Sequence, residues 1–295
     1  MKTWKYVRLT LPIVFLIIAI LSTGCVTHRV HGEYLDAKGV SLHYTVEGEG
    51  TPVILVHGVA VNADLNWRRP GITRALAKNY RVISFDNRGH GLSDKPHGQQ
   101  HYGLEMVEDV VRLMDHLGIE KAHVIGYSMG GFITLKLLTE HPDRLLSAAP
   151  CGAGWEHRDE DGSRRLEAIA NALESHGDYG SLLEEVGVRK KGLGRIQIVV
   201  MNRFFRCIND EQAVADVMRS LAELELAASD LRGNAVPVLS IVGDVDPLKR
   251  GVDNMAGVLA NHEIVIVPGA THYSTLNKRE MISALRDFLA RHSVE

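Results

Sequence analysis

The sequence predicts an α/β fold, in which a mostly parallel central sheet is flanked by helices and carries an inserted, mainly helical cap. Short apolar runs alternate along most of the chain with segments whose apolar residues recur every three or four positions. The alternation stops between residues 153 and 233, where only helical patterns are convincing. At 295 residues, one domain with an insertion is therefore expected.

Seven apolar runs are expected to form the strands. Most of them are apolar almost throughout, without period-two alternation, which is typical of strands covered on both faces in a parallel sheet. They are VSLHYTV (40–46), PVILVHG (52–58), RVISFD (81–86), KAHVIGY (121–127), LLSAAPCG (145–152), PVLSIVG (237–243) and EIVIVPG (263–269).

Amphipathic helices are expected between several of these strands and within the cap, because apolar residues recur there at helical spacing. Asn209, with Gln212 three residues later, is the expected N-cap of a cap helix, whereas IQIVV (196–200) is ambiguous between strand and helix. The four stripes are Leu104, Val107, Val111, Met114 and Leu117; Leu166, Ile169, Ala170 and Leu173; Ala213, Val214, Val217, Leu221 and Leu224; and Met281, Leu285, Phe288 and Leu289.

The chain is expected to divide into five segments. Residues 1–25 form an export signal and residues 26–35 a polar tether, residues 36–152 and 234–295 form the core, and residues 153–233 form the helical cap.

The N-terminal segment has the pattern of an export signal. Three basic residues precede LPIVFLIIAIL (11–21), an apolar run that is short for a membrane span. LSTGC (21–25) resembles a bacterial lipobox with Cys25 as the lipid attachment residue, although Ser22 stands where Leu is preferred. An exported, membrane-anchored cell-envelope lipoprotein is expected; an uncleaved anchor and a plain secretory signal are the alternatives.

The composition favours a small-molecule partner. The chain is 45% hydrophobic with a formal net charge of −3, so no charge excess points to nucleic acid. With Cys25 lipidated, Cys151 and Cys207 remain, and burial is expected for them rather than pairing, although pairing stays open. No Cys/His cluster has zinc-ligand spacing, so neither a metal nor a cofactor is expected.

The motif GYSMG (126–130) points to a nucleophile. It fits G-x-S-x-G where an expected strand turns into an expected helix, and such a strained turn needs small neighbours around the serine. Ser128 is therefore the candidate nucleophile, and an ordinary capping serine in a tight turn is the alternative.

A serine hydroxyl needs a base that is oriented by a carboxylate. His272 follows the last expected strand, which places it at the same edge of the sheet as Ser128, and so it is the candidate base among 15 histidines. Asp246, just beyond PVLSIVG, is the candidate carboxylate, whereas Asp244 is expected to close the turn. A surface-loop histidine and a loop aspartate bonded to nearby backbone are the alternatives.

Backbone N–H groups are expected to stabilise the negative charge on the substrate oxygen. One belongs to Met129, at the start of the helix, and the other to Val59, after Gly58 in HGVAVN. His57 is then expected to anchor this loop rather than to act as a second base.

These motifs together resemble the α/β-hydrolase family, since HGV, DNRGHGLSDKP, GYSMGG, GDVD and GATH occur in the family's order. The resemblance covers residues 36–152 and 234–295. It implies that residues 153–233 are a mobile cap, and that Asp86 and Arg88 in DNRGHGLS are anchors of a structural loop rather than catalysts. It also implies a triad and an oxyanion hole at the candidate positions, namely Ser128, Asp246, His272, Val59 and Met129.

Several other residues have a less specific pattern. His90, His97 and His101 suggest a metal site, but surface loop histidines explain them better. Trp67 and Trp155 are expected either to line a pocket or to pack in the core.

The expected function is that of an exported serine hydrolase that forms an acyl-enzyme on Ser128 with an ester-like small molecule. Two alternatives remain: a hydrolase of carbon-carbon bonds in a diketone-like acid, and a weakly catalytic ligand-binding lipoprotein. Halide and epoxide chemistry is disfavoured, because the family branches that perform it have Asp where this chain has Ser128.

Overall fold

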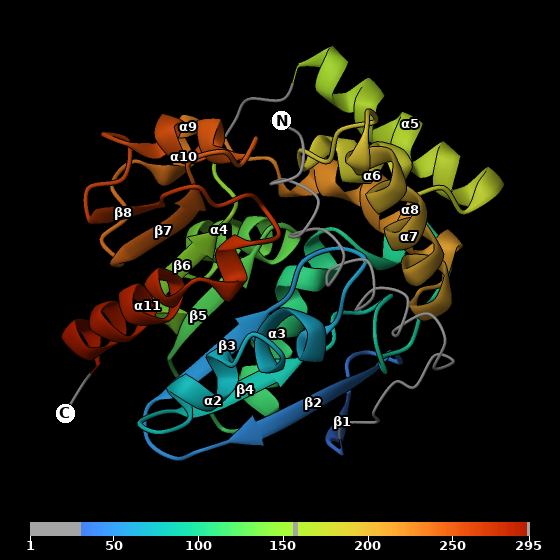
Figure 1. The fold of residues 1–295 in the computed structure, drawn as a ribbon. Coiled ribbons are helices and arrows are strands. Elements are labelled where there is room, and N and C mark those ends of the chain that lie inside the picture. Colours follow the sequence, from blue (N-terminus) through green and yellow to red (C-terminus); the bar gives the residue numbers. More distant parts are fainter. Residues whose placement is uncertain (1–30, 156–158, 294–295) are drawn as a thin grey trace, which may run out of the picture.

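The computed structural model describes residues 31–155 and 159–293, and within them it confirms the expected α/β fold. An eight-stranded sheet has the order β1-β2-β4-β3-β5-β6-β7-β8, in which β1, β2 and β4 pair antiparallel and the remaining pairs are parallel (Figure 1). The strands are β1 (Glu33–Asp36), β2 (Ser41–Glu47), β3 (Pro52–Val56), β4 (Arg81–Phe85), β5 (Ala122–Tyr127), β6 (Leu145–Cys151), β7 (Val238–Gly243) and β8 (His262–Val267).

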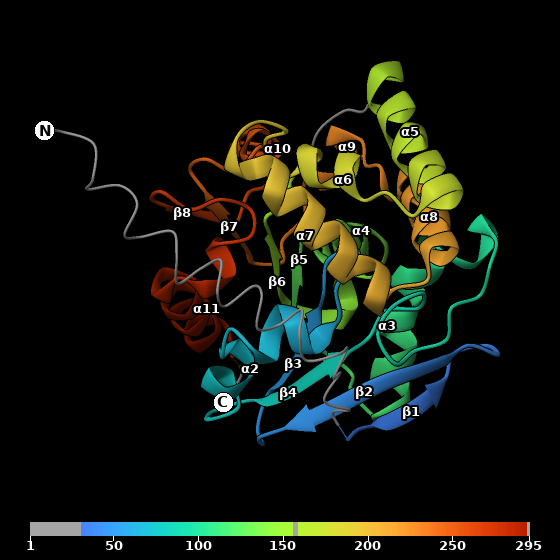
Figure 2. The same cartoon turned by 45° about the vertical axis from the view of Figure 1, so that its right-hand side comes forward.

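Helices cover both faces of the sheet, as Figures 1 and 2 show. The helices of the sheet layer are η1 (Asp64–Arg68), α2 (Ile72–Leu76), η2 (Gln99–His101), α3 (Leu104–His116), α4 (Met129–Glu140), η3 (Pro142–Arg144), α10 (Lys249–Met255), η5 (Thr275–Asn277) and α11 (Arg279–His292). Apolar side chains of α3 and α4 pack on one face, and those of α2 and α11 pack on the other.

The central strands are apolar throughout because both of their faces are covered. Along β3, Ile54 and Val56 belong to the core under α3 and α4, whereas Val53 and Leu55 belong to the core under α2 and α11. This two-sided burial explains why the strand sequences lack polar alternation.

The chain between β6 and β7 is helical wherever it is described, apart from its connecting loops. We call its helices the inserted helices: α5 (Glu160–His176), α6 (Gly180–Glu185), α7 (Leu193–Ile208), α8 (Glu211–Ser220), η4 (Leu221–Leu224) and α9 (Ala228–Leu231). They lie over the edge of the sheet at which the parallel strands end (Figure 2).

Three local features differ from expectation. β1 begins at Glu33, within the expected tether, because Glu33–Asp36 pairs antiparallel with β2 and buries Leu35. IQIVV, whose sequence was ambiguous between strand and helix, lies inside α7 and is helical because its neighbours along the chain are helical. The N-cap of α8 is Asp210, whose carboxylate accepts from the N–H of Ala213; Asn209 instead ends α7.

The expected export signal and Cys25 lie outside the described residues. Within the described ranges, no helix has the length and apolar character needed to cross a membrane.

Candidate active site

Ser128 lies at the sharp turn between β5 and α4. It has φ 55° and ψ −118°, a backbone conformation that non-glycine residues rarely adopt. The turn is held by its backbone, because the Ser128 N–H donates to Cys151 O at 2.9 Å and its carbonyl accepts from Gly131 N at 2.8 Å. The fold therefore stabilises a strained residue at the end of a central strand, a common property of functional positions.

Only glycine fits at the positions around Ser128. A Cβ atom on Gly126 would lie 1.9 Å from Gly130 O, and a Cβ atom on Gly130 would lie 2.0 Å from Val56 O. A Cβ atom on Gly131 would lie 2.5 Å from the Ala153 side chain. Close packing of the strand, turn and helix thus explains why the serine stands among glycines.

His272 and Asp246 lie in the loops that follow β8 and β7, and they are joined by a hydrogen bond. His272 Nδ1 is 2.8 Å from Asp246 Oδ2, and both side chains are buried. Asp246 Oδ1 also accepts from Leu248 N at 2.9 Å, which fixes the carboxylate on its other side. Asp244, in contrast, is exposed.

Tyr127 connects this pair with the serine turn. Its hydroxyl donates to the backbone carbonyl of His272, and the two rings lie 5.2 Å apart between centroids. Ser128 is the next residue after Tyr127. No hydrogen bond between Ser128 and His272 is present among the described residues, which is common for catalytic contacts before a substrate binds.

The loop after β3 brings Val59 to the same place. A Cβ atom on Gly58 would lie 3.2 Å from Ser128 Cβ, closer than most Cβ contacts, so glycine favours the close approach of this loop to the serine. Gly58 N donates to Asn66 Oδ1 at 3.0 Å, and Ala60 has φ 60°. Met129, as the first residue of α4, has an N–H without an intrahelical acceptor.

His57 anchors this loop as a neutral side chain. Its Nε2 accepts from Asn87 N at 2.9 Å, which leaves Nδ1 as the donor to Gly58 O at 2.7 Å. Complete burial lowers the pKa of His57, so the neutral form is favoured. Both ring nitrogens are occupied, and none is left for substrate.

The segment DNRGHGLS forms a buried hydrogen-bonded loop beside β4. Asp86 accepts from Ala63 N at 2.9 Å and Leu92 N at 2.9 Å, and it contacts His43 Nδ1 at 3.2 Å. Burial opposes ionisation of Asp86, but these bonds and nearby imidazoles hold its pKa below the ordinary value. Arg88 forms a bidentate pair with Asp109 of α3, at 2.6 and 2.7 Å, and so ties the loop to the helix layer.

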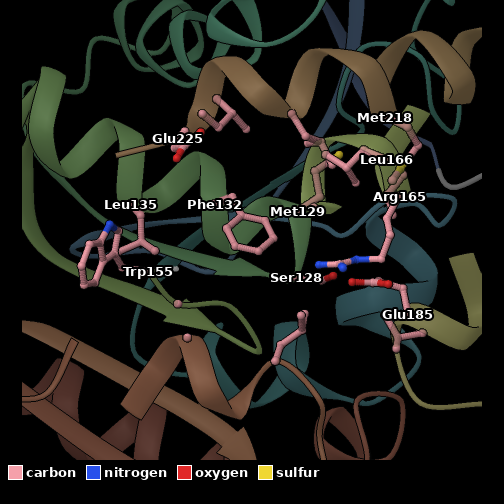
Figure 3. A pocket seen from close by; sticks show the side chains of 18 of the residues that line it. Ser128, Met129, Phe132, Leu135, Trp155, Arg165, Leu166, Glu185, Met218 and Glu225 are labelled. Atoms are coloured by element: carbon pink, nitrogen blue, oxygen red, sulfur yellow. The ribbon is translucent and has the colours of Figure 1, made fainter. Parts of the chain in front are cut away.

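A cavity of about 230 Å³ lies between Ser128 and the inserted helices. Figure 3 shows Ser128 facing it, with Phe132 and Trp155 to one side and Arg165 and Glu185 to the other. Val59 and Met129 also line it, whereas His272 does not. The volume is below the roughly 300–1,000 Å³ of typical drug-sized ligand sites, which favours a small substrate.

The two tryptophans have different surroundings. Trp155 lines the cavity, and its Nε1 donates to Leu226 O at 2.8 Å, whereas Trp67 is fully buried and packs edge-on against Tyr127.

The remaining candidate ligands do not cluster. The described residues contain no group of three or more His, Cys, Asp or Glu side chains arranged to hold a metal ion. His97 is exposed and pairs with Asp210 at 3.1 Å. His90 is not a surface residue as expected: it is fully buried, and its Nδ1 contacts Arg88 O within the DNRGHGLS loop. Cys151 is buried on β6 as expected, and no disulfide joins it to Cys207. The expected burial of Cys207 is wrong, because its position on α7 is exposed.

Sequence reasoning missed three residues that support the site. Asn66 holds Gly58, Tyr127 holds the His272 backbone, and Asn209 donates from the end of α7 to Ala60 O at 3.0 Å. The Tyr127 and Asn209 contacts join residues 145 and 149 positions apart, so local patterns contained no signal for them. The Asn66 contact spans eight positions, but no sequence motif marks it.

Comparisons with known proteins support the fold and the family. The family model described as alpha/beta hydrolase fold matches residues 51–173. The chain is 38% identical to a 2-hydroxy-6-oxo-6-phenylhexa-2,4-dienoate hydrolase of Comamonas testosteroni over 41% of this chain and 44% of that protein, so it matches less than half of that relative's length.

Two similarities extend over nearly the whole chain. A pimeloyl-acyl-carrier protein methyl ester esterase of Aliivibrio fischeri is 26% identical over 85% of this chain and 98% of its own. The crystal structure of the enol-lactonase from Burkholderia xenovorans LB400 superposes with a TM-score of 0.73 at 24% identity, covering 88% of this chain and 100% of the lactonase.

Proposed function

Because this chain belongs to the α/β-hydrolase fold family, we propose that it is a serine hydrolase that cleaves an ester-like bond in a small molecule. The observation that carries the proposal is the buried 2.8 Å contact between His272 Nδ1 and Asp246 Oδ2, in loops beside the strained Ser128 turn. The methyl ester esterase among the relatives supports the choice of an ester bond.

In the proposed reaction, Ser128 Oγ attacks the carbonyl carbon and its proton passes to His272 Nε2. Asp246 holds the Nδ1–H tautomer and stabilises the imidazolium. The N–H groups of Val59 and Met129 donate to the carbonyl oxygen as it becomes negative. His272 then protonates the departing alcohol, and a water molecule, activated by the same imidazole, releases the acid from Ser128.

The inserted helices supply the rest of the proposed pocket. Phe132 and Trp155 offer apolar walls, while Asp159, Arg165 and Glu185 contribute charges of both signs. Because the pocket lining carries charges of both signs, its net charge does not favour a substrate of either sign. The small cavity favours a short acyl group.

Substitution of Ser128 by Ala tests the mechanism. Turnover of short p-nitrophenyl esters should fall to the background that binding and the oxyanion donors alone maintain, a loss on the order of 10³-fold or more. The thermal unfolding midpoint should remain near that of the unsubstituted chain, since Ala, like Ser, has a Cβ atom and is under similar strain at this positive φ. A fluorophosphonate probe should label the unsubstituted chain and not Ser128→Ala; turnover that survives the substitution contradicts the mechanism.

A carbon-carbon bond hydrolase is the second candidate, and one observation favours it. A 2-hydroxy-6-oxo-6-phenylhexa-2,4-dienoate hydrolase is among the relatives, at 38% identity over 127 residues. A vinylogous diketone acid cleaved faster than every ester tested would favour this candidate over the esterase. A ligand-binding protein without turnover, the third possibility, would leave the fluorophosphonate probe unreacted.

We also propose that the chain is exported and held at a membrane through lipid on Cys25. The basic residues, the apolar run 11–21 and LSTGC support this proposal. Intact-mass measurement of the protein from cell envelopes should find a new N-terminus at a diacylated Cys25; a mature chain with an unmodified Cys25 would rule the lipid out.

A further inference from the structure

α7 has an exposed apolar face that no other described element covers. Leu193, Ile196 and Val199 are 69%, 60% and 64% exposed, the highest values among the large apolar side chains of the described residues. Their spacing of three positions places them along one side of the helix. Figure 2 shows α7 crossing the near side of the molecule with no element in front of it.

The opposite side of α7 is held by the protein core. Phe205 is buried, and four further apolar side chains pack against the core: Ile198, Met201, Phe204 and Ile208. Asn202 Oδ1 also accepts from Tyr179 N at 2.9 Å. The helix therefore cannot turn its exposed apolar side inward without losing this packing, and large exposed apolar patches of this kind usually mark an interaction site.

Basic side chains surround the apolar face. Residues 189–208 contain no Asp or Glu in a chain whose net charge is −3. Six exposed basic residues lie in this segment, namely Arg189, Lys190, Lys191, Arg195, Arg203 and Arg206. Lys190 pairs with Glu184 and Arg206 lies 3.6 Å from Glu211, while the other four form no ion pair with a described residue.

We propose that this face, formed by Leu193, Ile196, Val199 and the basic residues of 189–206, lies on the surface of a bilayer that contains anionic lipids. Apolar side chains enter the region between headgroups and acyl chains, and long Arg and Lys side chains reach back to the phosphates. The contact places the bilayer against the inserted helices, which also line the cavity at Ser128.

The charge pattern favours lipid over a second copy of the chain. A two-fold contact through this face would bring two sets of like charges together, which is unfavourable. The N-terminal segment is no better as an occupant, since Lys2, Lys5 and Arg8 have the same sign. Anionic headgroups provide the complementary charge.

Tryptophan quenching tests the contact in the full chain. It measures whether a tryptophan placed on α7 enters the bilayer, whether or not the N-terminus is also attached to it. Ile196→Trp adds a fluorophore to the proposed face, and Arg286→Trp adds one to an exposed position on α11. With vesicles of phosphatidylcholine and phosphatidylglycerol that carry brominated acyl chains, the fluorescence added by Ile196→Trp should be largely lost. The fluorescence added by Arg286→Trp should persist in the same vesicles.

Charge removal tests the electrostatic part. In the Ile196→Trp background, Arg195→Gln with Arg203→Gln should lower the equilibrium constant for the α7 contact by roughly 25-fold, since each basic residue near an anionic surface contributes about fivefold. The matched pair Arg164→Gln with Arg286→Gln should leave it unchanged. Turnover of a water-soluble ester should be the same in all variants, which reports that they are folded.

Three results would overturn the proposal. The first is persistent Ile196→Trp fluorescence in the anionic vesicles, and the second is equal quenching in vesicles of phosphatidylcholine alone. The third is a dimer in sedimentation that Ile196→Gln converts to a monomer without lipid, because the face would then be a contact between copies of the chain.

Discussion

Asp244 and Asp246 stand two positions apart, yet only Asp246 reaches the imidazole of His272. The carboxylate of Asp246 is buried between His272 Nδ1 and the N–H of Leu248, whereas Asp244 is exposed at the end of β7. A histidine that accepts a proton at Nε2 must carry its other proton on Nδ1, and the Asp246 carboxylate stabilises that tautomer.

Asp246→Asn should therefore reduce kcat for an ester substrate by on the order of 10³ to 10⁴-fold, because the amide allows the wrong tautomer. Asp244→Asn is the matched control and should retain the kcat of the unsubstituted chain. Steady-state kinetics and the thermal unfolding midpoint of both variants check this. Equal losses in the two variants would remove Asp246 from the proposed mechanism.

β5 shows how a whole strand limits what its side chains can do. The strand is buried along its full length, and His123 within it contacts Ser147 Oγ at 2.7 Å and Ser293 Oγ at 3.3 Å. Burial, assisted by the charge of His292, lowers the pKa of His123 to about 4. The imidazole is thus neutral in the native strand, where it packs in the protein interior and forms hydrogen bonds with the two serines.

The free energy of unfolding should consequently fall as pH decreases from about 6.5 to about 4. In this window the unfolded chain binds a proton at His123 that the native chain does not, so stability rises with pH by up to about 1.4 kcal/mol per unit for this group. His123→Gln keeps hydrogen-bonding capacity without titration, and it should reduce the loss of stability between pH 6.5 and 4.5. Urea denaturation at the two pH values measures it; an unchanged pH slope would contradict the assignment.

The inserted helices and the core meet at the candidate oxyanion loop. Asn209, between α7 and α8, donates to the carbonyl of Ala60, whose φ is 60°, and Ala60 is the residue after Val59. Trp155 and Leu226 form a contact at 2.8 Å within the inserted segment, beside the cavity. The position of the Val59 N–H thus depends on how the inserted helices sit on the sheet.

Asn209→Ala should lower kcat by roughly tenfold with little change in KM, less than the 10²–10³-fold loss of a complete oxyanion donor, because the Val59 N–H is displaced and not removed. Asn171→Ala, at an exposed position on α5, is the control and should leave kcat unchanged. Steady-state measurement of kcat and KM for both variants with one soluble ester checks this prediction. A parallel loss of unfolding midpoint and no change in kcat would assign Asn209 a structural role alone.

Local sequence patterns were sufficient to predict the α/β fold, strands β2 to β8 and the candidate site residues. Apolar runs identify the strands that are covered on both faces, because every residue of such a strand is buried. Glycines identify the Ser128 turn, because a Cβ atom at their positions would have no space. Edge strand β1 and the Asp210 cap were not predicted. A four-residue strand is too short to show a clear apolar pattern, and one side-chain hydrogen bond does not change the local pattern of residues.

Tertiary structure alone decided which neighbouring residues meet and which side of each helix faces solvent. Tyr127 and Asn209 act through contacts with residues 145 and 149 positions away, and no local period encodes such separations. α7 has apolar residues on two sides, and only the packing of Phe205 into the core determines that Leu193, Ile196 and Val199 face outward. Sequence periodicity reports that a side chain is apolar; the assembled core determines whether anything covers it.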